Sequence, residues 1–402
     1  MAAQGRHAAE HGANTIKVER RRRMNLQFAG RGTCARAATG YLAGRRGARA
    51  ISALGLFAVS TAAQADGLSV SGLAAGGITY TSNVGGSARY GVDSAPLRPN
   101  YLAFNGSETI AAGTSAYFRL AGRYLLDNGN TIGQLFNTYS IVGLRGDLGD
   151  ISLGNMRDFM FEYFTVGGFS GSWYGGLWGA GQGPFQNFGG VYGGVRGGSA
   201  DYDRSNGEAL GNGIKYATQL GPLKLGVMYA FGERPGSVRD GSSYSAGALY
   251  ESGRFGATVA FTDFSDSSTP TSNAHIRTLG SGLKWGTRDW TFAGSYSRTE
   301  NAATDGVINN FGIGVTRSFG DRYGLTFHYQ YMKGNGVLQD RHAHQFLARA
   351  ETSLSQRTRV YVQAAYQRAG GTADAKAWIN GVAGPADGKQ QTVAGLFVEH
   401  TF

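Results

Sequence analysis

Of the 402 residues, 66 are glycine, 12% are aromatic and only 16% are charged. Glycine is more than twice as frequent as the usual ~7%, yet no regular glycine repeat occurs, and the many aromatics exclude both collagen and a disordered chain. The longest apolar run, near residues 51–59, is far shorter than the ~20 residues that a membrane-spanning helix needs. A β-rich chain with many glycine turns remains, forming one large barrel or two modest domains.

The formal net charge of +11 is unevenly distributed along the chain. Residues 1–65 contain 11 Lys and Arg but 2 Asp and Glu, which leaves 27 basic and 25 acidic side chains in residues 66–402. A basic patch is the usual mark of a nucleic-acid or anionic-membrane partner. Because the segment after residue 65 is nearly neutral, the charge does not indicate nucleic-acid binding.

The basic N-terminal segment has the order of an export signal. Three arginines within residues 45–49 precede the apolar stretch 51–59, and the small residues Ala63 and Ala65 follow it. A positive region, a short apolar region and small residues at the cut are typical of a secretory signal peptide. We therefore expect residues 1–65 to be an N-terminal extension with a signal peptide, and the mature chain to begin at Asp66.

Two alternatives concern the same segment. It is long for a signal peptide, and Met24, which follows the arginine run at 20–23, is an alternative start of translation to Met1. Arg45 and Arg46 also permit a twin-arginine export signal. The single cysteine, Cys34, lies in the removable segment, so the exported chain is expected to have no disulfide, thiol nucleophile or thiolate metal site.

From residue 67 onward, apolar and polar residues alternate in segments of about ten residues that are closed by turn residues. We expect short turns at 108–113, 146–150, 219–222, 251–254, 285–289, 319–322 and 353–357. Longer connections are expected at 81–99, 123–133, 159–208, 234–240, 265–274, 300–307, 334–341 and 370–389. Long and short connections that alternate in this way predict sixteen antiparallel strands, with all long loops at one end.

The two faces of the predicted strands differ in polarity. In the last strand, Leu396 and Val398 alternate with Gly395 and Glu399. An apolar outer face, a polar inner face and an even strand count are typical of an outer-membrane barrel. Aromatic residues near strand ends fit the girdles at the membrane interfaces: Tyr229, Phe231, Tyr250, Tyr296, Tyr329, Tyr331 and Tyr366.

Several stretches together resemble the sixteen-stranded general porins of β-proteobacteria, the neisserial and burkholderial type. They are 106–108 with the glycine turn after it, 139–149, 153–154, 213–216, 354–361 and the end 400–402. The resemblance spans the predicted mature chain. It implies an all-β transmembrane barrel, a homotrimer, lipid and lipopolysaccharide around it, and passive diffusion of small hydrophilic solutes and ions. It also implies that the terminal Phe402 is read by the outer-membrane assembly machinery.

In such porins a long third loop folds into the barrel and forms the constriction, and by position residues 159–205 correspond to it. A sixteen-stranded barrel is otherwise too wide to select solutes, and a loop this long is usually functional. Here the loop is rich in glycine and aromatics, including Trp173, Tyr174 and Trp178, and holds few acids: Glu162, Asp201 and Asp203. We expect these aromatics either to pack on the inner wall or to form a surface for sugars or aromatic solutes.

The wall also departs from the family pattern. Positions that are commonly arginine in the family are Tyr101, Thr138 and Asn155. The basic candidates near the lumen are Arg119, Arg123, Arg157, Arg196, Arg204 and Arg349. Because the usual arginines are missing, we expect weaker anion selectivity than the family implies.

Catalytic and metal motifs are not evident. The residues after 65 contain no nucleophile elbow, phosphate-binding loop or His-Glu-x-x-His motif. His342 and His344 share a predicted strand face without a third ligand, and the sequence near Asp201 and Asp203 is a poor match to a calcium loop. We expect no enzyme, cofactor or metal site. The expected function is passive diffusion, and the alternative is a structural or adhesive barrel whose lumen is plugged.

Overall fold

The computed structural model describes residues 67–186, 188, 206–265 and 275–402. All of them belong to one compact unit, Ser60–Phe402. The predicted signal peptide, the cut before Asp66, Met24 and Cys34 lie outside the described residues. So do Arg196, Asp201, Asp203 and Arg204 of the long loop.

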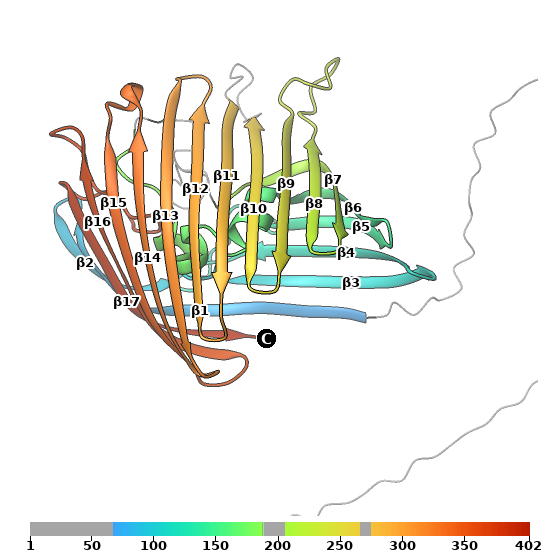
Figure 1. Ribbon diagram of the computed structural model, residues 1–402, viewed down its shortest axis with the longest axis horizontal. Helices are drawn as coiled ribbons and strands as arrows, with labels where there is room; N and C mark the ends of the chain where they lie inside the picture. The colour runs from blue at the N-terminus through green and yellow to red at the C-terminus, as the bar shows by residue number, and fades with distance from the viewer. Residues whose placement is uncertain (1–66, 187, 189–205, 266–274) are drawn as a thin grey trace, which may run out of the picture. The chain divides into compact units, whose positions relative to one another are not determined.

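The described part of the chain is almost entirely antiparallel sheet (Figure 1). Its first strands are β1 (Gly67–Val84), β2 (Ser87–Ser94), β3 (Tyr101–Ala111), β4 (Thr114–Arg123), β5 (Tyr139–Gly146) and β6 (Gly149–Arg157). The middle strands are β7 (Ala209–Leu220), β8 (Leu223–Ala230), β9 (Ser243–Ser252), β10 (Phe255–Ser265), β11 (His275–Gly286) and β12 (Trp290–Asn301). The last strands are β13 (Gly306–Phe319), β14 (Tyr323–Gly334), β15 (His342–Ser353), β16 (Thr358–Gly370) and β17 (Gln390–Thr401).

The sheet closes on itself through the first and last strands. Gly76 of β1 pairs with Val398 of β17 on one side and with Ser94 of β2 on the other. The N-terminal half of β1 pairs with β3, where Leu73 faces Tyr101. Since β2 and β3 are two halves of one strand that runs beside β1, the seventeen segments make a barrel of sixteen strands, as predicted.

One predicted connection is different in the structure. Residues 81–99 were expected as a long loop, but β1 and β2 continue into it and are joined by a tight turn at Gly85 and Gly86, which have φ of +60° and +100°. The interruption lies instead at residues 95–100. It contains Pro96 and Pro99, and proline cannot donate a ladder hydrogen bond, which explains why the strand breaks there.

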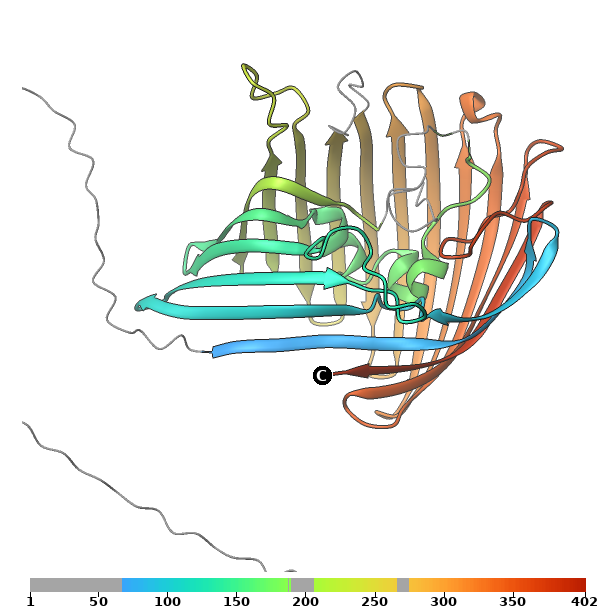
Figure 2. The ribbon, with the colours of Figure 1, turned by 180° about the vertical axis from the view of Figure 1, so that it is seen from behind.

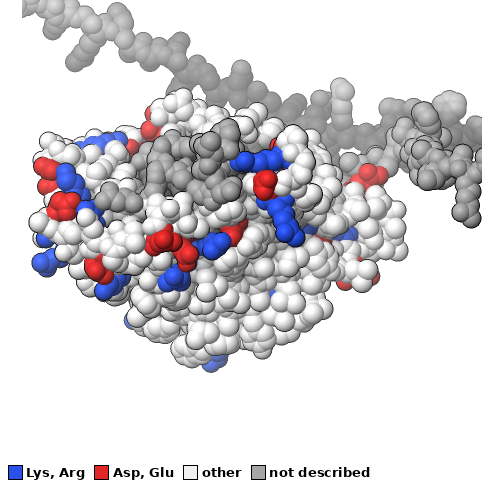
Figure 3. Space-filling view, turned by 90° about the horizontal axis from the view of Figure 1, so that it is seen from above, with Lys and Arg blue, Asp and Glu red and all other residues white. Residues whose placement is uncertain are grey.

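The seven short turns lie where the alternation predicts them, each between two consecutive strands. Four of them contain a glycine with φ between +57° and +72°, namely Gly113, Gly221, Gly253 and Gly320, a conformation that favours glycine because it has no Cβ. The longer connections emerge at the opposite end of the barrel (Figure 1). Viewed from that end, basic and acidic side chains are interspersed and form no single-sign patch (Figure 3).

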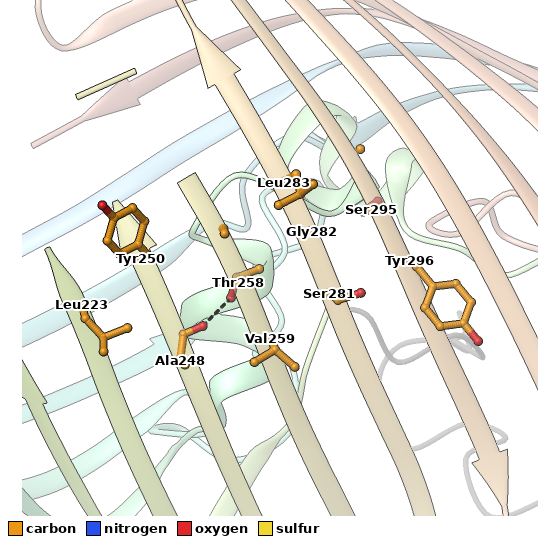
Figure 4. A pocket seen from close by; sticks show the side chains of 12 residues that line it. Leu223, Ala248, Tyr250, Thr258, Val259, Ser281, Gly282, Leu283, Ser295 and Tyr296 are labelled. Atoms are coloured by element: carbon orange, nitrogen blue, oxygen red, sulfur yellow. Dashed lines mark hydrogen bonds between the residues drawn. The ribbon is translucent and has the colours of Figure 1, made fainter. Parts of the chain in front are cut away.

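The outer face of the barrel is apolar and the inner face is mixed, as the alternation predicts. Leu396 and Val398 are each 52% exposed, whereas Phe397 and Glu399 between and after them are buried inside. A shallow groove on the outer face of β8–β12 is lined by small and apolar residues such as Ala248, Val259 and Leu283 (Figure 4). It lies outside the barrel, away from the lumen, and its surface is mostly apolar.

Among the residues described, no helix is long and apolar enough to cross a membrane. The helices of the loop between β6 and β7 are single turns: the π-helix η1 (Met160–Thr165), α1 (Gly171–Gly175) and the 3-10 helix η2 (Gly176–Gly179). Another single turn, η4 (Gly336–Leu338), lies between β14 and β15. The first three lie within the barrel (Figure 2), where η1 contacts β9, β10 and β11, and α1 contacts β13, β14 and β15.

Candidate functional site: the loop inside the barrel

The inner loop begins at a buried carboxylate. Asp158 is fully buried, and its carboxylate oxygens accept hydrogen bonds from the Phe161 backbone N–H (2.9 Å) and the Thr262 hydroxyl (2.7 Å). Its own N–H donates to the Glu208 carbonyl at 2.9 Å, which joins the two ends of the loop. Burial, reinforced by the nearby charge of Glu208, raises the pKa of Asp158 to about 6, although hydrogen bonds with Thr262 and with the backbone of Phe161 and Glu208 oppose the shift.

Glycines of the barrel wall receive the aromatic side chains of the loop. A Cβ added to Gly226 or Gly247 would clash with Phe159, one added to Gly280 or Gly282 with Met160 or Phe169, and one added to Gly314 with Tyr174. These glycines lie on β8, β9, β11 and β13. The loop therefore runs across the inner wall at van der Waals distance, and we call these five positions the glycine track.

Buried side chains of β15 and β16 hold the far part of the loop by its carbonyl groups. Gln345 donates to the Trp178 carbonyl at 2.8 Å and Gln363 to the Gly175 carbonyl at 2.9 Å. Arg349 donates to the Tyr174 carbonyl. Both glutamines are at most 1% exposed, so these hydrogen bonds are shielded from water and fix the path of α1 and η2.

The aromatic residues of the loop divide into two groups. Tyr174 (1% exposed) stacks on His328 with ring centroids 5.3 Å apart, and Trp178 (4% exposed) packs edge-on against Phe397 at 5.5 Å. Only Trp173 of the three named from the sequence is exposed, at 51%. Of the two arrangements that the sequence leaves open, Tyr174 and Trp178 adopt packing on the inner wall, where both are buried.

Trp178 also reaches the strand interruption at 95–100. It shares an apolar cluster with Leu97, Tyr361 and Phe397, and the partly buried Tyr101 packs against this cluster. The Leu177 N–H donates to the Pro96 carbonyl at 2.8 Å. At this wall position, where the family commonly has arginine, Tyr101 therefore packs against the apolar cluster.

Three predicted arginines meet around one tyrosine. The Arg119 guanidinium lies 4.5 Å from the ring centre of Tyr139, and the charges of Arg119, Arg123, Arg157 and Glu162 all act on that residue. The Arg157 guanidinium also lies 4.8 Å from the Phe161 ring centre. The structure therefore brings these four charged residues together at the junction of β4, β5, β6 and the loop.

Glu162 has a partner that the sequence did not suggest. The Lys215 ammonium of β7 lies 2.5 Å from a Glu162 carboxylate oxygen and also donates to the Arg157 carbonyl at 2.7 Å. Lys215 lies in the middle of β7, and the alternation along this strand predicts that its side chain points into the barrel but does not predict what it contacts. Its contact with the loop could not be inferred without knowing the loop's path.

The two remaining wall positions lie near the start of β5. The Thr138 hydroxyl donates to the Asn137 side-chain oxygen at 3.1 Å, and Asn155 donates to the Phe136 carbonyl at 3.4 Å. Both bonds tie the wall to residues 136 and 137, which precede β5. In the place of arginines, these positions have neutral side chains that bind backbone or amide oxygen.

A charged network on β15–β17 and the interruption at 95–100 was mostly not predicted from the sequence. Glu399, 2% exposed, accepts hydrogen bonds from Arg98 and from Arg359 (2.6 Å), and Arg359 lies 3.4 Å from Glu351. Glu351 in turn accepts from Arg349 at 2.8 Å. This chain of ion pairs runs from the interruption at 95–100 to the arginine that holds the Tyr174 carbonyl, and only Arg349 was named from the sequence.

The structure also places the histidine pair and the terminal phenylalanine that were named from the sequence. His342 and His344 share the outer face of β15, and the His344 ring bonds the Tyr329 hydroxyl at 2.8 Å. Within the described ranges no group of three His, Cys, Asp or Glu residues could hold a metal ion.

Phe402 exchanges two backbone hydrogen bonds with Gly72, at 3.0 and 3.1 Å, and its ring covers that glycine.

Known proteins are similar to this chain in sequence and in overall fold. An outer membrane porin protein 32 of Delftia acidovorans is 25% identical over 375 residues, which cover 88% of this chain and 99% of that protein. An anion-selective porin from Comamonas acidovorans superposes with a TM-score of 0.67 at 19% identity, covering 84% of this chain and 99% of the other. OmpF of Salmonella typhi superposes with a TM-score of 0.56 at 14% identity, covering 83% and 97%.

The family model for Gram-negative porins matches residues 50–372. This range covers most of the chain, including every strand from β1 to β16. The structure is a closed barrel with an apolar outer face and a loop seated inside it. These features agree with the family match. The chain belongs to the Gram-negative porin family and is a passive diffusion channel of the outer membrane.

Proposed function

We propose that solutes and ions pass between the free face of the inner loop and the wall formed by β3–β6. Phe159, Phe169 and Tyr174 of the loop lie on the glycine track of β8–β13, and Trp178 reaches the interruption at 95–100. This seating is the observation that carries the proposal. Residues 159–186 then set the size limit of the channel, as a constriction in an aqueous barrel does.

Charge at this passage is set by the cluster around Tyr139. The charges of Arg119, Arg123, Arg157 and Glu162 all act on Tyr139, and the charge of Glu162 is offset by Lys215. The passage therefore carries net positive charge, and we infer a moderate preference for anions. A structural relative is named as anion-selective, and the neutral side chains of Tyr101, Thr138 and Asn155 favour a weaker preference in this chain.

Planar-bilayer recordings of the refolded mature protein test both points. Discrete conductance steps are expected, whereas a silent, folded barrel would support the plugged structural or adhesive alternative. Under a salt gradient, the reversal potential should indicate a moderate anion preference that grows when Glu162 is replaced by Gln. Near-ideal anion selectivity of the native protein would contradict the proposed role of the three neutral wall positions.

Several properties of the family are proposed for this chain as well. We infer export by the signal peptide with the mature end at Asp66, and assembly into a homotrimer surrounded by lipid and lipopolysaccharide. A relative of this fold is described in a trimer form. Phe402, which completes the pairing of β17 with Gly72, is proposed as the signal for the assembly machinery. We propose that the channel carries out no catalysis.

A further inference from the structure

One large aromatic side chain of the inner loop is left uncovered. Trp173 is 51% exposed, while its neighbour Tyr174 is 1% exposed. Since α1 lies inside the barrel and its other side packs on β13–β15, the exposed indole faces the lumen. No described residue accepts a hydrogen bond from its ring N–H.

A lysine lies beside this indole. A Cβ added to Gly168 would be 3.6 Å from the Trp173 ring nitrogen and 3.8 Å from the Lys284 ammonium, so these two nitrogens are at most 7.4 Å apart. Gly168 has φ of +92°, a conformation that lets the loop reverse at this point without a side chain between the two groups.

The lysine belongs to a charged group with a net charge of +1. The Lys284 ammonium donates to the Gly167 carbonyl at 2.6 Å and to Glu251 at 2.7 Å, and Lys224 binds the other oxygen of Glu251 at 3.1 Å. The Lys284 and Lys224 side chains are 25% and 38% exposed. Two ammonium groups therefore share one carboxylate while remaining accessible to water.

We propose that Trp173, Lys284 and Lys224 form a subsite for aromatic carboxylates within the channel. The solute ring stacks on the exposed indole face, which favours offset aromatic contacts. Its carboxylate binds the lysine ammonium groups or the indole N–H through charge-assisted hydrogen bonds. This inference rests on the proposed diffusion function and adds a solute class for which the channel has affinity.

Fluorine NMR titration of the folded protein in detergent tests the subsite without requiring conduction. The probes are 4-fluorobenzoate, trifluoroacetate (carboxylate alone) and 4-fluorobenzyl alcohol (ring alone). We expect 4-fluorobenzoate to bind at least about fivefold more tightly than either partial probe, as one aromatic contact of ordinary strength gives. Equal affinities for the three probes would overturn the proposal.

Variants assign the binding to the named residues. Trp173→Leu should weaken 4-fluorobenzoate about fivefold and leave trifluoroacetate unchanged, and Trp173→Phe should recover part of the loss. Trp285→Leu is the matched control, because Trp285 is 47% exposed on the outer face; it should have no effect. Unchanged binding by Trp173→Leu, or an equal loss from Trp285→Leu, contradicts the subsite.

Two further measurements distinguish a failure of the proposed subsite from misfolding of a variant and from a failure of the proposed diffusion function. If Trp173→Leu does not fold, Lys224→Gln, which lies outside the loop, must still weaken 4-fluorobenzoate severalfold, and unchanged binding overturns the subsite. Conductance in potassium chloride is recorded in parallel. A silent channel that binds the probe refutes the diffusion pathway alone, whereas a conducting channel without ring preference refutes the subsite alone.

Discussion

Asp158 links the seating of the inner loop to pH. Its folded pKa of about 6 is above its ordinary value of 3.8, so the seated loop favours the protonated carboxyl. Protonated Asp158 stabilises the seated loop, and this stabilisation is fully present below pH 3.8 and is lost as the pH rises through about 6. A shift of this size corresponds to at most about 3 kcal/mol.

We expect hydrogen–deuterium exchange of residues 158–165, corrected for intrinsic rates, to become faster between pH 5 and pH 7.5. The Phe161 amide, which donates to Asp158, reports directly on this seating. Asp158→Asn should remove the pH dependence because its side chain stays neutral, and Asp147→Asn, in an exposed short turn, should retain it. Identical profiles for Asp158→Asn and the native protein would show that another group controls the loop.

At the scale of elements, the glycine track explains how a long loop packs in a barrel without distorting it. Met160 and Phe169 fill the space that side chains at Gly280 and Gly282 would occupy. Close-packed interiors resist added volume, and overpacking costs typically about 1–3 kcal/mol. The seating of the loop should therefore depend on inward glycines and not on outward ones.

Gly282→Ala tests whether the loop depends on an inward glycine, and Gly294→Ala, at an outward glycine, is the matched control. A Cβ at Gly282 would lie 2.7 Å from the Phe169 ring, whereas nothing lies within 4 Å of one at Gly294. We expect Gly282→Ala to lower the loop's stability by about 1–3 kcal/mol, seen as larger fluctuations of the open-channel current. Gly294→Ala should leave the recordings unchanged, and equal noise in the two variants would contradict the track.

For the whole molecule, the strand count and the short turns could be predicted because alternation and turn residues are local signals. The break at 95–100 was also signalled, by Pro96 and Pro99, although the expected loop at 81–99 obscured it. Contacts between the loop and the wall were not predictable. Packing of loop aromatics on the wall was one of the two expectations, but which of them pack there, and the pairing of Lys215 with Glu162, depend on the path of the loop, which no local pattern encodes.

The barrel and its inner loop should be separable, because the ladder from β1 to β17 does not pass through the loop. Its strands pair with their neighbours on both sides without residues 158–208. We therefore expect deletion of residues 167–190 to leave a heat-modifiable folded barrel. Gly282 and Gly314, which Phe169 and Tyr174 cover, and the buried Gln345 and Gln363 would then face water, which their small or polar character tolerates.

The same deletion should raise single-channel conductance severalfold, because it removes the segment that occupies the lumen over β11–β15. Insertion of an equal number of residues at 234–240, a connection at the same end of the barrel, is the control and should leave conductance near the native value. A folded deletion variant with native conductance would place the narrowest part of the channel elsewhere. The remaining candidate is then the arginine cluster of the wall, where Arg119 and Arg123 lie on β4 and not on the loop.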